Sequence, residues 1–196
     1  MYDVLIIGAG AAGYGCAITL ASANEKFEWA KNKKYIVIDD NNSDISKASF
    51  YNLAGVTFGI NGDELLDTIS QQLKNYNNCE IITDTIVQIN KKDNLFEVVS
   101  HKNKYIASIV VIATGMHKFN IKCDFVEVLT HNDVLKPNKV CLQNIDNKIT
   151  DGLYVAGLAS GSKTMFAIAN GDGVKVACDI FKIWTKKPAV VHDIIK

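Results

Sequence analysis

The chain has 196 residues, a length typical of one domain, and 48% of them are hydrophobic, which is enough for a buried core. Its 21 acidic side chains are balanced by 21 basic ones, all of which are lysine. A neutral chain without arginine is a poor candidate for nucleic-acid binding, which depends on basic patches and bidentate arginine contacts.

The cysteines argue against a zinc site or a local redox dithiol, because no C-x-x-C pair is present. There are five of them, at Cys16, Cys79, Cys123, Cys141 and Cys178. An odd, scattered set indicates reduced thiols and a cytoplasmic protein. Residues 4–24 are uncharged, but four glycines in the first half of this run would make a weak helix, so no membrane span is expected. No lysine precedes the run, as a signal peptide would need.

Residues 1–40 predict a βαβ unit. The apolar runs at 2–7 and 35–38 are typical of buried strands, and residues 11–23 are predicted as a helix between them. A strand, a helix and a strand within this length indicate a parallel sheet. After the polar loop 40–49, a second helix is expected from about residue 61, where Asn61 can act as the N-cap.

Short β-rich runs follow from residue 80 to residue 108. The runs EIITDTIVQI, LFEVVS and KYIAS are separated by the turns NKKDN and HKN, which predicts a three-stranded antiparallel meander. Buried strands are predicted at 109–115 and 152–157, with an irregular stretch between them and a helix of about 20 residues that ends at Thr185. The expected fold is a three-layer α/β domain whose parallel sheet has helices on one side and the meander on the other.

Gly8, Gly10 and Gly13 form a G-x-G-x-x-G motif between the first strand and the first helix. In such a motif the first glycine permits a tight turn, the second lets a pyrophosphate approach the main chain, and the third lets helix and strand pack closely. The helix N-terminus then favours the phosphates. Asp39, at the end of the second strand, can accept hydrogen bonds from a ribose. The pattern predicts a dinucleotide site for NAD or FAD; a glycine-rich packing turn is the alternative.

Four further stretches resemble the thioredoxin reductase branch of the FAD-dependent pyridine nucleotide–disulfide oxidoreductases. VVIATG (110–115) is similar to the family's second flavin motif, and DGLYVAGLASG (151–161) to its third, G-x-x-x-A-G-D. MFAIANGDG (165–173) resembles the helix start that faces the flavin, and YNLAGVTFGINGDELLDTI (51–69) the N-x-P-G segment and its helix. The resemblance covers most of the chain in the right order. It implies a Rossmann-like FAD-binding domain similar to short thioredoxin reductase-related proteins.

The resemblance also implies which residues hold FAD, whereas no catalytic residue and no metal site are predicted. The implied positions are Gly8, Ala9, Gly10, Ala11, Ala12 and Gly13 for the pyrophosphate, Asp39 with Asp40 for the adenosine ribose, the Val87 backbone for the adenine, Asn52 near the flavin, Ala113, Thr114 and Gly115 along the cofactor, Gly157 and Leu158 at the ribityl chain, and the main chain of Phe166 and Ala167 at the flavin O2. A helix N-terminus carries about half a positive charge, so the last contact should raise the flavin's reduction potential.

The chain departs from the family pattern in two places. Leu158 stands where the family usually has an aspartate for the ribityl hydroxyls, and the lost hydrogen bond costs about 1 kcal/mol. Residues 116–150 are also too few for the NAD(P)H domain that full-length relatives insert there, since such a domain needs about 100 residues. We therefore expect a single FAD-binding domain, residues 1–196, whose halves 1–115 and 151–196 are joined by a short irregular segment.

Three functions are compatible with this pattern. The first is a small FAD-dependent oxidoreductase or electron-transfer protein that accepts electrons from NAD(P)H or from a protein partner, and it is not a self-sufficient thioredoxin reductase. The second is a flavin-binding module without turnover of its own, which acts with a separate redox protein. The third is a single NAD(P)-binding domain. The family resemblance also implies a homodimer.

Some other residues are given a structural interpretation. Cys16 is expected to be a buried packing thiol, and a disulfide between Cys123 and Cys141 is not favoured. His101 and His131 are expected at the surface, whereas His117 is the better candidate to lie near a flavin. Ring stacking and core packing stay open for Tyr51 and Phe166, and core packing or a dimer face for Phe181, Ile183 and Trp184.

Overall fold

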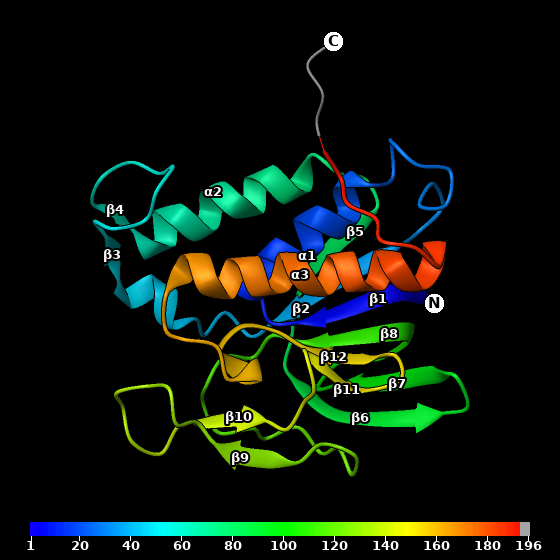
Figure 1. Ribbon diagram of the computed structural model, residues 1–196. Helices are drawn as coiled ribbons and strands as arrows, with labels where there is room; N and C mark the ends of the chain where they lie inside the picture. Colours follow the sequence, from blue (N-terminus) through cyan, green and yellow to red (C-terminus); the bar gives the residue numbers. More distant parts are fainter. Residues whose placement is uncertain (193–196) are drawn as a thin grey trace.

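A mainly parallel sheet forms the middle of the molecule in the computed structural model, which describes residues 1–192 (Figure 1). Its strand order is β11-β12-β8-β1-β2-β5, and all neighbours are parallel except β11 and β12. The strands are β1 (Tyr2–Ile7), β2 (Tyr35–Asp39), β5 (Cys79–Thr83), β8 (Lys104–Ile112), β11 (Lys148–Thr150) and β12 (Leu153–Val155). The predicted α/β class with a parallel sheet is confirmed.

The central strands are apolar on both faces because both faces are covered. In β1, Val4 and Ile6 point into the core beneath the helices, while Leu5 and Ile7 point into a second core on the opposite face. All four are at most 5% exposed. The alternation follows from the two-residue period of a strand, and it explains why the run carries no polar residue.

Three helices cover one face: α1 (Ala11–Ser22), α2 (Gly62–Lys74) and α3 (Phe166–Thr185) (Figure 1). Helices α1 and α3 pack closely because glycines lie at their contact. A Cβ on Gly15 would come within 2.5 Å of the Asn170 carbonyl oxygen, and one on Gly173 would overlap the backbone of Ala12. Helix α2 begins as expected, with Asn61 Oδ1 accepting a hydrogen bond from the Glu64 amide at 2.9 Å.

The opposite face carries the antiparallel strands β6 (Ile86–Lys92) and β7 (Leu95–Ser100). Strand β6 pairs with β7, and β7 pairs with the first half of β8. The three-layer arrangement is confirmed, but the strands of the meander have different bounds from those predicted. Residues 79–83 are β5, a parallel neighbour of β2, and residues 104–112 are one strand. The sequence from Lys104 to Ile112 contains no turn residue, so β8 continues from the meander into the main sheet without a break.

The remaining elements are short. The segment predicted to be irregular holds β9 (Val128–Thr130) and β10 (Val140–Leu142), and a small hairpin joins β3 (Ser49–Phe50) to β4 (Ile60–Asn61). Two 3-10 helices complete the order, η1 (Asp44–Lys47) and η2 (Gly157–Ser160). No helix within residues 1–192 is long and apolar enough to span a membrane.

Aromatic packing fixes the end of α3. Phe181 is fully buried and meets Trp29 edge to face at 5.0 Å between centroids, while Trp184 stacks on Tyr35 at 6.4 Å. Ile183 is 39% exposed on the other side of the helix. Core packing is therefore the observed role of the two aromatic residues.

Candidate functional site

The predicted site residues gather at the carboxyl edge of the sheet. Strands β12, β8, β1 and β2 are neighbours in that order, and all four run in the same direction. Their ends therefore bring Gly157, Ala113, Gly8 and Asp39 to one edge, although these residues are far apart in the sequence. Ligands of open α/β sheets bind at this edge.

Gly8 and Gly13 are required by the fold itself. Gly8 has φ +103°, and a Cβ on it would lie 2.5 Å from the Ala113 carbonyl oxygen. A Cβ on Gly13 would overlap the carbonyl group of Gly8, so the first turn of α1 can pack on the β1 turn only without a side chain there. These two positions match the packing roles that the motif predicts.

Gly10 is different, because the fold does not need it. Its φ of −82° suits any residue, and the nearest atom to an added Cβ is the Ser43 Oγ at 4.0 Å. Gly115, after β8, also faces open space, with no atom of the described chain within 4 Å of an added Cβ, although its φ of +76° favours glycine. Open space beside an unshielded main chain is what a diphosphate needs.

The N-termini of α1 and α3 lack side-chain caps. Gly10 and Met165 hold the N-cap positions, and neither helix has an acidic residue in its first turn. By contrast, Asn61 caps α2 and Ser43 caps η1. The first amide groups of α1 and α3 have no intrahelical acceptor, so both ends attract an anionic or electron-rich group.

Asp39 braces the glycine turn. Its Oδ1 accepts a hydrogen bond from the Ala9 amide at 2.7 Å, and its Oδ2 accepts one from the Asn41 amide at 2.9 Å. The carboxylate thereby links the ends of β1 and β2, and it keeps further acceptor capacity for a ribose hydroxyl. Asp40 is exposed beside it and accepts a hydrogen bond from the Asn42 amide.

A second neighbourhood lies where α3 begins. The ring of Phe166 meets that of Phe50 edge to face at 5.6 Å, which ties the β3–β4 hairpin to this helix end. Asn52 is exposed in the hairpin loop, and Ala167 is exposed in the first turn of α3. The residues implied for the flavin are therefore grouped, apart from the glycine turn but on the same edge.

Two of the implied positions have backbone contacts of their own. The Val87 carbonyl in β6 accepts a hydrogen bond from the Lys122 amide at 2.9 Å. Gly157 has φ +71°, and a Cβ on it would lie 2.7 Å from the Cβ of Ala12, so the turn after β12 packs directly on the first turn of α1. Leu158 is half-buried in η2.

A family model described as pyridine nucleotide-disulphide oxidoreductase matches residues 2–148, well over half of the chain. The chain belongs to this family. Thioredoxin reductase from Buchnera aphidicola subsp. Acyrthosiphon pisum is 33% identical over 116 residues, which are 57% of this chain and 33% of that protein. Thioredoxin reductase from Treponema pallidum is 29% identical over 118 residues, or 58% and 35% of the two chains. The chain thus spans about a third of the length of the curated relatives it matches.

Solved structures of the family share the fold. A thioredoxin reductase from Gloeobacter violaceus aligns with a TM-score of 0.76 at 13% identity, over 100% of this chain and 99% of that chain. The atypical thioredoxin reductase TRi from Desulfovibrio vulgaris Hildenborough aligns with a TM-score of 0.72 at 13% identity, over 95% and 99%. The predicted resemblance to the thioredoxin reductase branch is confirmed.

His117, just after Gly115, joins η1 to the residue before β10, in contacts that the sequence did not suggest. Its Nε2 is 2.7 Å from Oδ2 of Asp44, and its Nδ1 is 3.2 Å from Nζ of Lys139. An ammonium group only donates, so Nε2 carries the proton and donates to Asp44. Partial burial opposes ionisation of Asp44, but the His117 hydrogen bond, with Lys47 and Lys136 nearby, lowers the pKa of its carboxyl group.

The thiols are not placed or tuned for disulfide exchange. All five cysteines are free, so Cys123 and Cys141 do not form a disulfide, and Cys16 is buried as expected. Burial raises the pKa of Cys79 to about 12 and that of Cys123 to about 11, and it also raises the pKa values of the other three thiols. Protonated thiols are poor nucleophiles, so none of these cysteines has the low pKa that a reactive thiol needs.

The exposure of two histidines and of Tyr51 was also a subject of the sequence predictions. The prediction that His131 lies at the surface is wrong, since it is only 5% exposed. Its amide donates to the Lys139 carbonyl at 2.9 Å and its Nδ1 accepts a hydrogen bond from the Asp133 amide at 3.3 Å, which hold it within the β9–β10 loop. His101 is exposed as expected. Tyr51 is 64% exposed and meets Phe58 edge to face at 5.1 Å, so it is not a core residue.

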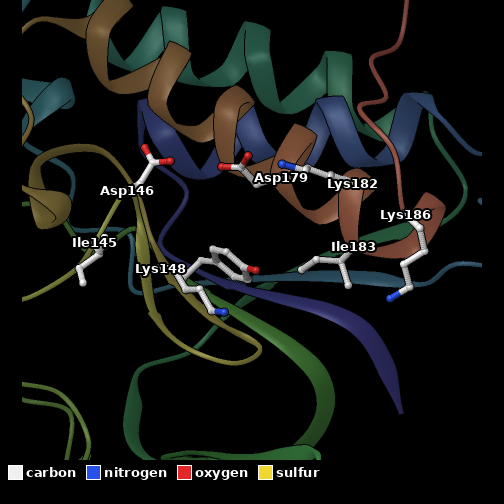
Figure 2. A pocket seen from close by; sticks show the side chains of 8 residues that line it. Ile145, Asp146, Lys148, Asp179, Lys182, Ile183 and Lys186 are labelled. Atoms are coloured by element: carbon white, nitrogen blue, oxygen red, sulfur yellow. The ribbon is translucent and has the colours of Figure 1, made fainter.

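A pocket of about 460 Å³ lies away from the predicted site, between β11 and the second half of α3 (Figure 2). None of the predicted site residues lines it. Its lining residues are Ile145, Asp146, Lys148, Tyr154, Asp179, Lys182, Ile183 and Lys186. Both aspartates pair with Lys175 at 2.9 Å, and the lysines at the end of α3 suit the negative end of the helix dipole. These charges are explained by the fold and do not indicate a ligand.

Proposed function

We propose that the chain binds one FAD, extended along the carboxyl edge of the sheet. The observation that carries this proposal is the difference between Gly10 and its neighbours. Gly8 and Gly13 are needed for packing, whereas Gly10 faces open space at the uncapped start of α1. A glycine that the fold does not require, at a helix end without a cap, is explained by a diphosphate that must approach the main chain.

The remaining roles follow from the arrangement of the edge. Residues 8–13 hold the diphosphate, Asp39 with Asp40 holds the adenosine ribose, and the Val87 backbone faces the adenine. Residues 113–115 and 157–158 border the middle of the cofactor. The uncapped start of α3, at Phe166 and Ala167, with Asn52 opposite, receives the flavin end. FAD rather than NAD is supported by this second uncapped helix end, since reduced flavin gathers negative charge at N1 and O2.

The proposed activity is electron or hydride transfer through the bound flavin. The isoalloxazine supplies the redox chemistry when bound, and the protein orients it and sets its potential. Strand β12, from the half that begins at residue 151, pairs directly with β8 from residues 1–115 in one sheet. This pairing supports a single FAD-binding domain with 116–150 as a short connection in place of an NAD(P)H domain. Without a C-x-x-C dithiol and with protonated thiols, disulfide reduction is assigned to another protein.

A second candidate is a flavin module that exchanges electrons with a separate protein. Exposed apolar side chains at the flavin end favour it: Phe58 is 79% exposed, Tyr51 64%, Ile168 45% and Met165 44%. An apolar rim of this kind is typical of surfaces that contact a partner. A homodimer and a cytoplasmic location stay predictions, to be checked by light scattering and by fractionation.

The visible spectrum distinguishes the candidates. Apo-protein is mixed with FAD, gel-filtered, and then titrated anaerobically with NADH and with NADPH. A yellow protein that bleaches with either nicotinamide supports the oxidoreductase, and a yellow protein inert to both supports the module. A colourless protein that binds NADH but not FAD would contradict the proposal.

A further inference from the structure

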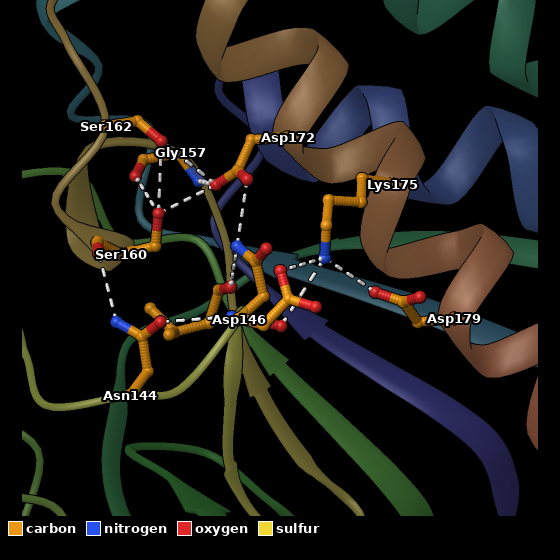
Figure 3. A network of polar contacts seen from close by, with 10 residues as sticks. Asn144, Asp146, Gly157, Ser160, Ser162, Asp172, Lys175 and Asp179 are labelled. Carbon is orange, nitrogen blue, oxygen red and sulfur yellow. Dashed lines mark hydrogen bonds and ion pairs between the residues drawn. The ribbon is translucent and has the colours of Figure 1, made fainter.

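An acid from α3 takes a place beside Leu158, where the family pattern has an aspartate. Oδ2 of Asp172 accepts hydrogen bonds from the Gly157 amide at 2.6 Å, the Ser160 hydroxyl at 2.7 Å and the Ser162 hydroxyl at 3.2 Å. Its Oδ1 accepts one from Nδ2 of Asn147 at 2.9 Å (Figure 3). The carboxylate is therefore bonded to the turn that follows β12, one residue away from position 158.

These donors take most of the acceptor capacity of the carboxylate, because three of them share Oδ2 and Asn147 binds Oδ1. A carboxylate offers about four acceptor positions, so at most one, on Oδ1, is left. The bonds that Asp172 forms go to the chain's own turn. They fix the geometry of that turn, because hydrogen bonds to a charged acceptor are about twice as strong as neutral ones.

All four donors are uncharged, so the negative charge of Asp172 is not neutralised locally. Among residues 1–192 no lysine or histidine forms an ion pair with it. Lys175, three residues further along α3, is held by Asp146 and Asp179 at 2.9 Å each, away from the turn (Figure 3). Asp172 therefore places a fixed negative charge at the edge of the sheet.

The same network reaches the short connecting segment. Asn147 is 6% exposed and donates from Nδ2 to the Val155 carbonyl at 3.0 Å, while its own amide donates to Oδ1 of Asn144 at 3.0 Å. Asn144 in turn donates to the Ser160 carbonyl at 3.0 Å. The segment that leads out of β10 is thereby locked onto the turn after β12.

The held turn lies against the glycine motif. Gly157 packs on Ala12 in the first turn of α1, and its amide is the one that Asp172 holds. We propose that Asp172 is a positioning residue for FAD, which fixes the 157–162 turn against α1 and lowers the reduction potential of the flavin through its charge. This inference rests on the proposed FAD binding, and it gives residues 142–147 a role in shaping the cofactor site.

The test compares D172N with D179N, which removes the same charge from the same helix but at a residue paired with Lys175. D172N is expected to weaken FAD binding about tenfold or more, because the charge-assisted bonds that hold the 157–162 turn are lost. It is also expected to raise the flavin midpoint potential, which a purely structural change would leave alone. D179N should change neither. A D172N affinity within about twofold of the native value, or an equal effect of D179N, would overturn the inference.

Two measurements keep the test decisive. If D172N does not fold, S160A replaces it in the test, because this variant removes one hydrogen-bond donor and keeps the charge of Asp172. S160A should weaken FAD binding about fivefold and leave the flavin midpoint potential unchanged. An S160A variant that binds FAD as tightly as the native protein would overturn the inference. If the native protein does not bind FAD, the proposed function fails. Amide exchange at Gly157 then tests the clamp alone: faster exchange in D172N apo-protein supports it, and an unchanged rate contradicts it.

Discussion

Substituting Gly10 and Gly13 separates the needs of the fold from those of the ligand. Alanine at position 10 meets no atom closer than 4.0 Å and has an ordinary φ of −82°, so it should leave the apo-protein as stable as before or stabilise it by about 0.4–1 kcal/mol. The same change at position 13 places a Cβ on the Gly8 carbonyl. Relieving that overlap should cost about 1–3 kcal/mol or more.

The effect of G10A on FAD affinity should differ from its effect on the stability of the apo-protein. The G10A methyl group occupies the space assigned to the diphosphate, so FAD should bind at least tenfold more weakly, about 1.4 kcal/mol. Urea unfolding of the apo-proteins gives the stabilities, and quenching of flavin fluorescence gives the dissociation constants. The reasoning is refuted if G10A binds FAD as tightly as the native protein, or if G13A is as stable as the native protein.

Two further predictions concern the acids near the glycine turn. D39N keeps the shape of Asp39 but weakens its bonds to the Ala9 and Asn41 amides, so urea unfolding should show a loss of about 1–3 kcal/mol; an unchanged midpoint would exclude the bracing role. H117A removes the hydrogen bond that depresses the pKa of Asp44, so that pKa should rise toward its ordinary 3.8. A carboxyl group whose pKa is depressed in the folded state contributes stability above pH 3.8, and this contribution is lost as the pH falls through the folded pKa. H117A should therefore have a lower free energy of unfolding at neutral pH and lose less of it on acidification. Superimposable curves of unfolding free energy against pH, from pH 3 to 7, would contradict this.

The sequence predicted the parts of the fold that depend on local pattern. Residues 4–7 and 35–38 are buried, and their apolar runs contain no polar residue that could have obscured the strand pattern. The cap at Asn61 and the end of α3 at Thr185 were also predictable, because the signals lie within a few residues. The pairing partner of a strand could not be predicted in this way. Residues 79–83 could belong to the meander or to the main sheet, and their pairing with β2 is determined by tertiary packing.

The candidate site divides in the same way. The glycine turn was predictable because each glycine of the G-x-G-x-x-G motif has a known steric role at its fixed position. Asp172 was part of a recognised motif, but its role depends on a turn that lies 15 positions away in the chain. The pairing of Asp44 with His117 joins residues 73 positions apart, and no periodicity relates them. Contacts of this kind become visible only when the strand order is known.

A crystal structure of the FAD complex tests the central claim most directly. The account predicts that the diphosphate lies beside Gly10 at the start of α1 and that the flavin O2 faces the amides of Phe166 and Ala167. Density for FAD in the pocket between β11 and α3, or a well-ordered glycine turn with no diphosphate at saturating FAD, would contradict it.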